Sequence, residues 1–204
     1  MRITGLAIVP PPTAADSVSQ FLKNLGQAGV LTAILLAMGS VAVEKERGTA
    51  ALLLTKPVSR AAFLLAKLLA ISATLLVGLL LAAIAGYYYT SILFDPLPPL
   101  GWAAMAGLLL LSLIAYASLT FMGSAMTRSS LAAAAIGIGA LILLAVISAL
   151  PTIGPFTPGG LGAPGAALAV GKEPGPIVGP LFTNLAGVAV VFAIAWIAFR
   201  RQEL

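Results

Sequence analysis

The stretch from which the rest of the chain can be interpreted is residues 44–67, EKERGTAALLLTKPVSRAAFLLAK. It contains five of the 11 basic residues and two of the six acidic residues. Long apolar runs precede it at residues 25–43 and follow it at residues 68–93. A charged segment between two such runs is expected to lie at a membrane surface, where a soluble partner can reach it.

The composition places the chain in a membrane. Hydrophobic residues make up 60% of the 204 residues and charged residues 8%, with a mean hydropathy of +1.10, whereas a typical soluble domain is about 25% charged. A helix needs about 20 apolar residues to cross a bilayer. Five runs are long enough, at residues 25–43, 68–93, 102–121, 131–150 and 181–199. Because none alternates like a barrel strand, the sequence predicts an all-α, polytopic integral membrane helical bundle of five spans, one domain over residues 1–204.

The distribution of Lys and Arg predicts the orientation of the spans. Eight basic residues would lie on one side and three on the other, Arg2, Lys23 and Lys172. The basic side is expected to face the cytoplasm, with the N-terminus outside and the C-terminus inside, in the cell (plasma or inner) membrane. Residues 1–24 would then form an extracytoplasmic tail, and residues 151–180, with eight glycines and seven prolines, an extracytoplasmic loop. Within that loop, residues 163–170 could form a short helix.

Several function classes are excluded by residues that the sequence lacks. There is no Cys and no His, which excludes disulfides, Cys/His metal sites and a Ser–His hydrolase arrangement. The sequence has no phosphate-binding loop of the form G-x-x-x-x-G-K-[ST]. The predicted spans contain no charged residue, whereas a proton-coupled pump normally needs a buried carboxylate. We therefore expect no catalytic or metal site, no cofactor of the chain's own and no nucleic-acid partner.

The polar residues of the predicted spans are mainly hydroxyls. They are Thr32, Ser40, Ser72, Thr74, Ser112, Ser118, Thr120 and Ser148. The simplest interpretation is that they support helix packing, and the alternative is that some line a substrate path. Aromatic residues flank the turn after the second span, namely residues 87–89 (YYY) and Trp102, and are expected to anchor the chain at the membrane interface.

The charged segment itself has a predictable local structure. Gly48 should break the helix that continues from the first span, and Thr49 should cap a short helix over residues 50–55. Pro57 should end that helix, and Ser59 should cap the helix that enters the second span. The short helix carries an apolar cluster framed by charge, Leu52, Leu53 and Leu54. From the residues alone, it is equally an interfacial loop held by anionic lipid.

This pattern resembles the permease subunits of ATP-binding-cassette (ABC) exporters of the second type. The resemblance is carried by Glu44, by Gly48-Thr49 with the three leucines, and by residues 57–60 (PVSR) and 63–67 (FLLAK). Residues 125–130 (AMTRSS), the long outer loop and residues 199–204 (FRRQEL) are similar to the same family. The resemblance extends from about Gln20 to the C-terminal end.

The resemblance implies that residues 44–60, the coupling segment, form a cytoplasmic coupling helix that docks onto an ATPase subunit. The residues implied in this role are Glu44, Arg47, Gly48, Thr49, Leu52, Leu53, Leu54, Pro57 and Arg60. ATP and Mg would be bound by that ATP-binding-cassette partner. A second permease copy or a paralogue would complete the transporter among the membrane lipids.

Members of this family usually have six spans, with both ends of the chain inside. The five spans predicted here, with the N-terminus outside, are similar to the arrangement of a family member that lacks the first helix. A shortened gene model, a split gene or a reduced variant would each account for this. Two other functions stay open, a secondary transporter and a non-transporting membrane assembly factor. The sequence does not select a substrate, although uncharged spans suit an amphipathic cargo.

Overall fold

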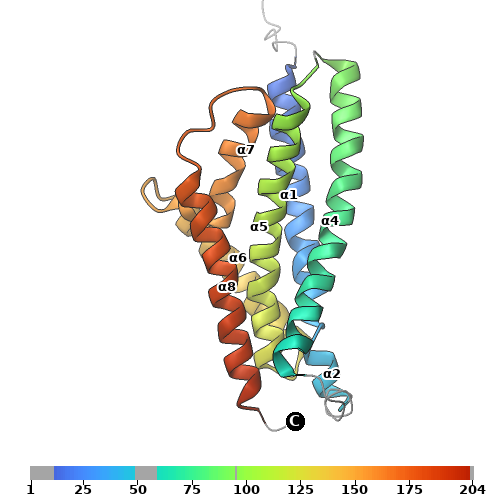
Figure 1. The fold of residues 1–204 in the computed structure, drawn as a ribbon, viewed down its shortest axis with the longest axis vertical. Coiled ribbons are helices and arrows are strands. Elements are labelled where there is room, and N and C mark those ends of the chain that lie inside the picture. Colours follow the sequence, from blue (N-terminus) through green and yellow to red (C-terminus); the bar gives the residue numbers. More distant parts are fainter. Residues whose placement is uncertain (1–11, 49–58, 95, 203–204) are drawn as a thin grey trace, which may run out of the picture.

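The structure of the chain, a computed structural model, describes residues 12–48, 59–94 and 96–202. The described parts are helical, and five of the helices are long and apolar enough to cross a membrane. These are α1 (Ala14–Met38), α4 (Arg60–Leu93), α5 (Pro99–Met126), α6 (Ser130–Ser148) and α8 (Val178–Arg200). The first candidate span includes the short helix α2 (Ala42–Glu46) after α1. The predicted all-α bundle of five spans is confirmed. The bundle is elongated, and α1 begins at the end opposite to the one where α8 ends (Figure 1).

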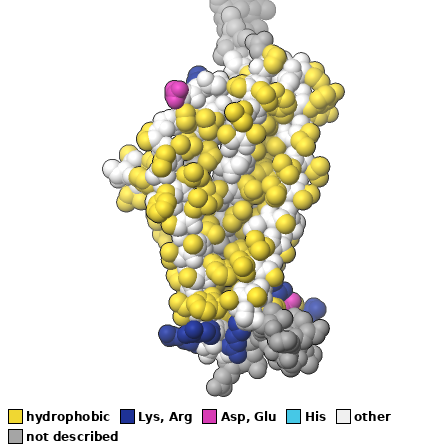
Figure 2. All heavy atoms as spheres, in the orientation of Figure 1, with side chains coloured by type: hydrophobic (Ala, Val, Ile, Leu, Met, Phe, Trp, Pro, Cys, Tyr) yellow, Lys and Arg dark blue, Asp and Glu magenta, His cyan; other side chains and the backbone are white. Residues whose placement is uncertain are grey.

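Helix α5 is the centre of the bundle and contacts α1, α4, α6, α7 (Gly162–Ala169) and α8. About two thirds of its most apolar stretch, 67%, is buried, against at most 33% in any other span. The outer helices instead expose large apolar side chains, such as Leu81 and Ile84 of α4, each 66% exposed. Apolar side chains cover most of the visible length of the molecule (Figure 2), as expected for a surface that contacts lipid.

The first helix begins at Ala14 rather than at residue 25. Thr13 and Asp16 form a capping box, in which the Thr13 hydroxyl accepts from the Asp16 amide at 3.3 Å and the Asp16 carboxylate accepts from the Thr13 amide at 2.8 Å. Residues 14–24, expected to form a tail, are therefore helical. The predicted run of residues 25–43 carries no charge, but the longer helix that contains it also includes Asp16 and Lys23.

Trp102 belongs to the core and is not an interfacial anchor. Its side chain is 4% exposed, its indole nitrogen donates to the Ala83 carbonyl at 3.0 Å, and its ring centroid lies 5.0 Å from that of Phe21. Tyr88 and Tyr89, at 62% and 64% exposed, have the exposure expected of anchors.

The region between α6 and α8 folds back against the bundle. It contains the 3₁₀ turns η1 (Gly154–Phe156) and η2 (Pro158–Leu161), followed by α7, which confirms the helix predicted over residues 163–170. The hydroxyls of Ser148 and Thr157 lie 2.6 Å apart. The buried Asn184 amide of α8 donates to the carbonyls of Phe156 at 3.2 Å and Thr157 at 3.4 Å. These bonds hold η1 and η2 between α6 and α8.

Candidate coupling site

The basic residues gather where α2 lies and where α5 and α8 end, and we name this part of the bundle the basic end. Its Lys and Arg residues form the dark blue cluster at the lower edge of Figure 2. The described members are Lys45, Arg47, Arg60, Lys67, Arg128, Arg200 and Arg201. Lys172 lies elsewhere, after α7, whose Leu168 contacts Gly101 near the start of α5. The basic end therefore holds the described part of the coupling segment.

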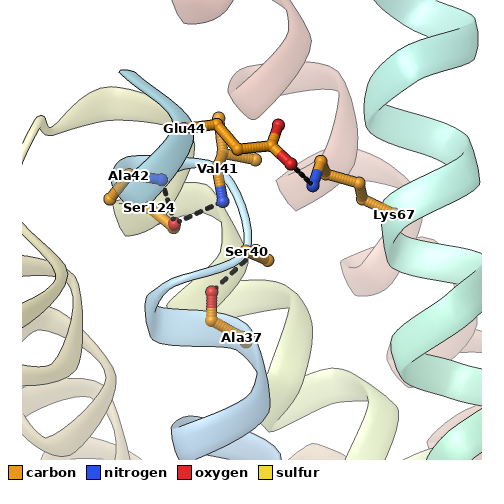
Figure 3. Close-up of polar contacts among 7 residues, drawn as sticks. All are labelled: Ala37, Ser40, Val41, Ala42, Glu44, Lys67 and Ser124. Carbon is orange, nitrogen blue, oxygen red and sulfur yellow. Dashed lines mark hydrogen bonds and ion pairs between the residues drawn. The ribbon is translucent and has the colours of Figure 1, made fainter. Parts of the chain in front are cut away.

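The chain first turns before Gly48, between α1 and α2. The hydroxyl of the buried Ser124 on α5 accepts hydrogen bonds from the amides of Val41 at 3.1 Å and Ala42 at 2.9 Å (Figure 3). These amides begin α2 and have no partner within their own helix. Ser40 donates to the Ala37 carbonyl at 2.8 Å and so supports the end of α1. A side chain 83 residues away along the chain thus fixes the direction of α2.

Lys45 is buried at the basic end, with 7% of its surface exposed. Its ammonium group donates to the Ala125 carbonyl at 2.7 Å and to the Gln202 side chain at 3.2 Å, and it lies 6.0 Å from the centroid of the Phe199 ring. Gln202 in turn donates to the Ala125 carbonyl at 3.1 Å. Carbonyl groups at the C-terminal end of a helix attract cations. Lys45 therefore ties α2 to the end of α5 and to the segment after α8.

Glu44 forms an ion pair within the chain. Its Oε1 lies 2.6 Å from Nζ of Lys67 on α4, and the two side chains are 27% and 24% exposed (Figure 3). Lys67 also lies 5.3 Å from the centroid of the Phe63 ring. The residue predicted to contact an ATPase thus holds α2 against α4.

Arg60, the first residue of α4, binds the end of α8. Its guanidinium Nη1 donates to the carbonyls of Phe199 at 3.2 Å, Arg200 at 2.9 Å and Gln202 at 3.0 Å. The rings of Phe63 and Phe199 stack beside it with centroids 5.8 Å apart. The predicted cap of this helix is confirmed, because the Ser59 hydroxyl accepts from the Ala62 amide at 3.1 Å.

Before the undescribed residues 49–58, the exposed part of the coupling segment is Glu46, Arg47 and Gly48. Gly48 has φ +70°, a left-handed conformation that favours glycine, and the break predicted there is confirmed. The remaining predicted coupling residues lie outside the described residues, together with the short helix predicted over residues 50–55: Thr49, Leu52, Leu53, Leu54 and Pro57.

Sequence reasoning missed Lys45, Ser124 and Gln202 as parts of this site. Their hydrogen-bond partners are backbone groups and side chains distant in sequence, and no local sequence pattern predicts these contacts. Among the described residues, no group of three or more acidic side chains could hold a metal ion. The described part of the site combines cations, the Glu44–Lys67 ion pair and helix-end carbonyls, so it can join helices and present a charged surface.

Comparison with known proteins identifies the family. The model of the ABC-2 family transporter protein matches residues 24–155, more than half of the chain. An uncharacterized transmembrane protein, YxlG of Bacillus subtilis (strain 168), is 32% identical over 128 residues. This match covers 63% of the chain and 50% of the relative, so the matched part spans about half the length of that protein. With five helices able to cross a membrane, the chain is a multi-pass membrane protein that belongs to the ABC-2 transporter family.

Proposed function

We propose that the chain is the membrane-spanning subunit of an ATP-driven exporter in the cell membrane, and that its basic end faces the cytoplasm. The family supports a transporter role. The charge distribution supports the orientation, because basic residues are retained on the cytoplasmic side of membrane proteins. In this proposal a separate ATP-binding-cassette subunit binds ATP and Mg, and a second permease copy or a paralogue completes the transporter.

The observation that carries this proposal is the way in which the two ends of the coupling segment are attached. At its start, Glu44 binds Lys67 of α4 and Lys45 binds the end of α5. At its other end, Arg60 binds the end of α8. A displacement of the coupling segment would therefore reach three membrane helices through short polar contacts.

The same contacts assign different roles to the charged residues. Glu44 and Arg60 are engaged within the chain, whereas Glu46 and Arg47 are exposed beside Gly48. In our proposal Glu46 and Arg47 make polar contacts with the ATPase, and Glu44 and Arg60 pass its movement to the helices. ATP can shift the permease between two states only by the difference in affinity of the ATPase for those states.

Co-purification with an ABC-type ATPase subunit from the same organism tests the proposal. The complex should hydrolyse ATP faster than the isolated ATPase. Arg47→Ala should remove most of this stimulation without changing membrane insertion, because the side chain is exposed. Arg201→Ala, which removes another exposed cation of the basic end, is the matched control and should retain it. A chain that binds no ATPase would overturn the proposal.

A further inference from the structure

A cavity of about 640 Å³ lies between α1, α5, α6 and the η2–α7 turn. Most of its wall is apolar, with leucines from three helices, Leu22, Leu109 and Leu141. Four polar side chains interrupt this wall: Lys23 and Gln27 of α1, and Ser112 and Tyr116 of α5. We name it the α1–α5 cavity. Its volume is in the range of about 300–1,000 Å³ that is usual for small-molecule sites.

The two hydroxyls of the cavity wall differ from the other hydroxyls of the spans. Ser118 and Thr120 on the same helix each donate to a carbonyl of the preceding turn, at 2.8 Å and 3.2 Å. The same holds for the other span hydroxyls of the sequence analysis, Thr32, Ser40, Ser72, Thr74 and Ser148. Most of the span hydroxyls therefore donate to a backbone carbonyl three or four residues earlier and do not form hydrogen bonds between helices.

Ser112 and Tyr116 are only 8% and 6% exposed, yet within the part of the chain that the structure describes neither hydroxyl has a hydrogen-bond partner. Neither oxygen is among the fully buried polar atoms that lack a partner, so both hydroxyls stay accessible. Both residues line the α1–α5 cavity, so an occupant of the cavity is in position to satisfy them.

The opposite wall of the cavity carries a cation. Lys23 and Gln27 are four residues apart and lie on one face of α1, where both are exposed. Across the described ranges, Lys23 forms no ion pair with an acidic residue. Because Lys23 and Gln27 are exposed and Ser112 and Tyr116 are buried, the cation marks the open side of the cavity and the hydroxyls mark its inner wall.

We infer that the α1–α5 cavity binds an amphiphile with one anionic head group, a carboxylate or a phosphate, and a hydrocarbon chain. The head group pairs with Lys23 beside Gln27, and the leucines contact the hydrocarbon. The hydroxyls of Ser112 and Tyr116 donate to a second oxygen of the same molecule, a carboxylate oxygen of a fatty acid or an ester oxygen of a phospholipid. The binding of this amphiphile is inferred from the cavity alone. Its role as transported cargo rests on the proposed function.

Photolabelling of the purified full chain in nanodiscs of neutral lipid tests the binding. The probes are palmitate carrying a diazirine, phosphatidylglycerol with a diazirine in its acyl chain, and a fatty alcohol of matched length as the neutral control. Mass spectrometry should place the label of an anionic probe on α1 and α5 at the cavity. Labelling by palmitate alone identifies a free amphiphile as the ligand, and labelling by phosphatidylglycerol identifies a membrane lipid.

Three substitutions report on the cavity wall. Lys23→Gln should reduce labelling by about tenfold, the effect expected from losing one charge-assisted hydrogen bond. Ser112→Ala and Tyr116→Phe should each reduce it severalfold. The matched controls are Lys172→Gln, a cation outside the cavity, and Ser118→Ala, a hydroxyl that is already satisfied. Equal labelling by the alcohol, unchanged labelling of Lys23→Gln, or a cavity that takes up no probe would overturn the inference.

The role of the site as a cargo site has a separate readout. Labelling needs no ATPase, so it can succeed even where the proposed function fails. In the complex with the ATPase, the anionic probe that labels the cavity, palmitate or phosphatidylglycerol, should stimulate ATP hydrolysis by the unmodified chain but not by Lys23→Gln. Labelling without such stimulation would overturn the cargo role and leave a lipid-binding site.

Discussion

Nζ of Lys67 on α4 lies 2.6 Å from Oε1 of Glu44 on α2, and this ion pair joins the helix that begins the coupling segment to the helix that follows it (Figure 3). The pair is mostly shielded from solvent, with about a quarter of each side chain exposed. The helix that begins the coupling segment is therefore held to the bundle at the side chain of Glu44, at the buried Lys45 and at its own first amides.

Exchanging the charges of this pair tests its contribution. Glu44→Lys and Lys67→Glu should each lower the melting temperature of the purified chain, because each places like charges side by side. The double variant should recover part of the loss, with a coupling free energy of about 1 kcal/mol. Glu46→Lys, at an exposed neighbouring position, is the control and should leave the melting temperature nearly unchanged. Purely additive effects of the two substitutions would show that the ion pair does not stabilise the fold.

The orientation can be measured directly because the chain has no Cys. A single cysteine at Lys172 should react with a membrane-impermeant maleimide on intact cells. A cysteine at Arg47 should react only after the cells are permeabilised. Both positions are exposed, so access to reagent and not burial decides the result. Labelling of the Arg47 position on intact cells would reverse the proposed topology and remove the coupling segment from the ATPase.

The contact between α7 and α5 depends on Gly101. A Cβ added there would overlap the backbone carbonyl of Leu168, which cannot move without shifting α7. Gly101→Ala should therefore destabilise the chain by about 1–3 kcal/mol. Gly107→Ala is the matched control on the same helix, because its Cβ would meet nothing within 4 Å. It should be neutral or stabilising by up to about 1 kcal/mol, through helix propensity. Equal melting temperatures for the two variants would contradict this packing.

Local signals predicted several elements correctly. The Ser59 hydroxyl caps α4, and Gly48 adopts the conformation that ends the helix before it. The start of α1 was misplaced because hydropathy detects only the apolar part of a helix. The capping box of Thr13 and Asp16 was a sequence signal for the true start.

Local sequence patterns could not predict which partner each side chain contacts. Trp is a residue type that often anchors a chain at the membrane interface, yet the ring of Trp102 is buried against Phe21. Ser112 and Ser118 are the same residue type on one helix, but Ser118 donates to a backbone carbonyl while Ser112 faces the α1–α5 cavity. Which surface a side chain meets depends on the rotation of each helix against its neighbours.

Membrane class and helix number follow from composition and run length, because transfer of apolar residues into lipid depends on each segment separately. The asymmetry of basic residues is likewise a property of the linear chain. Only the packed bundle decided that Glu44 and Arg60 bind within the protein while Arg47 stays exposed, since those contacts join residues as far apart as Arg60 and Gln202. A contact between distant helices exists only once their packing has brought both partners within hydrogen-bonding distance.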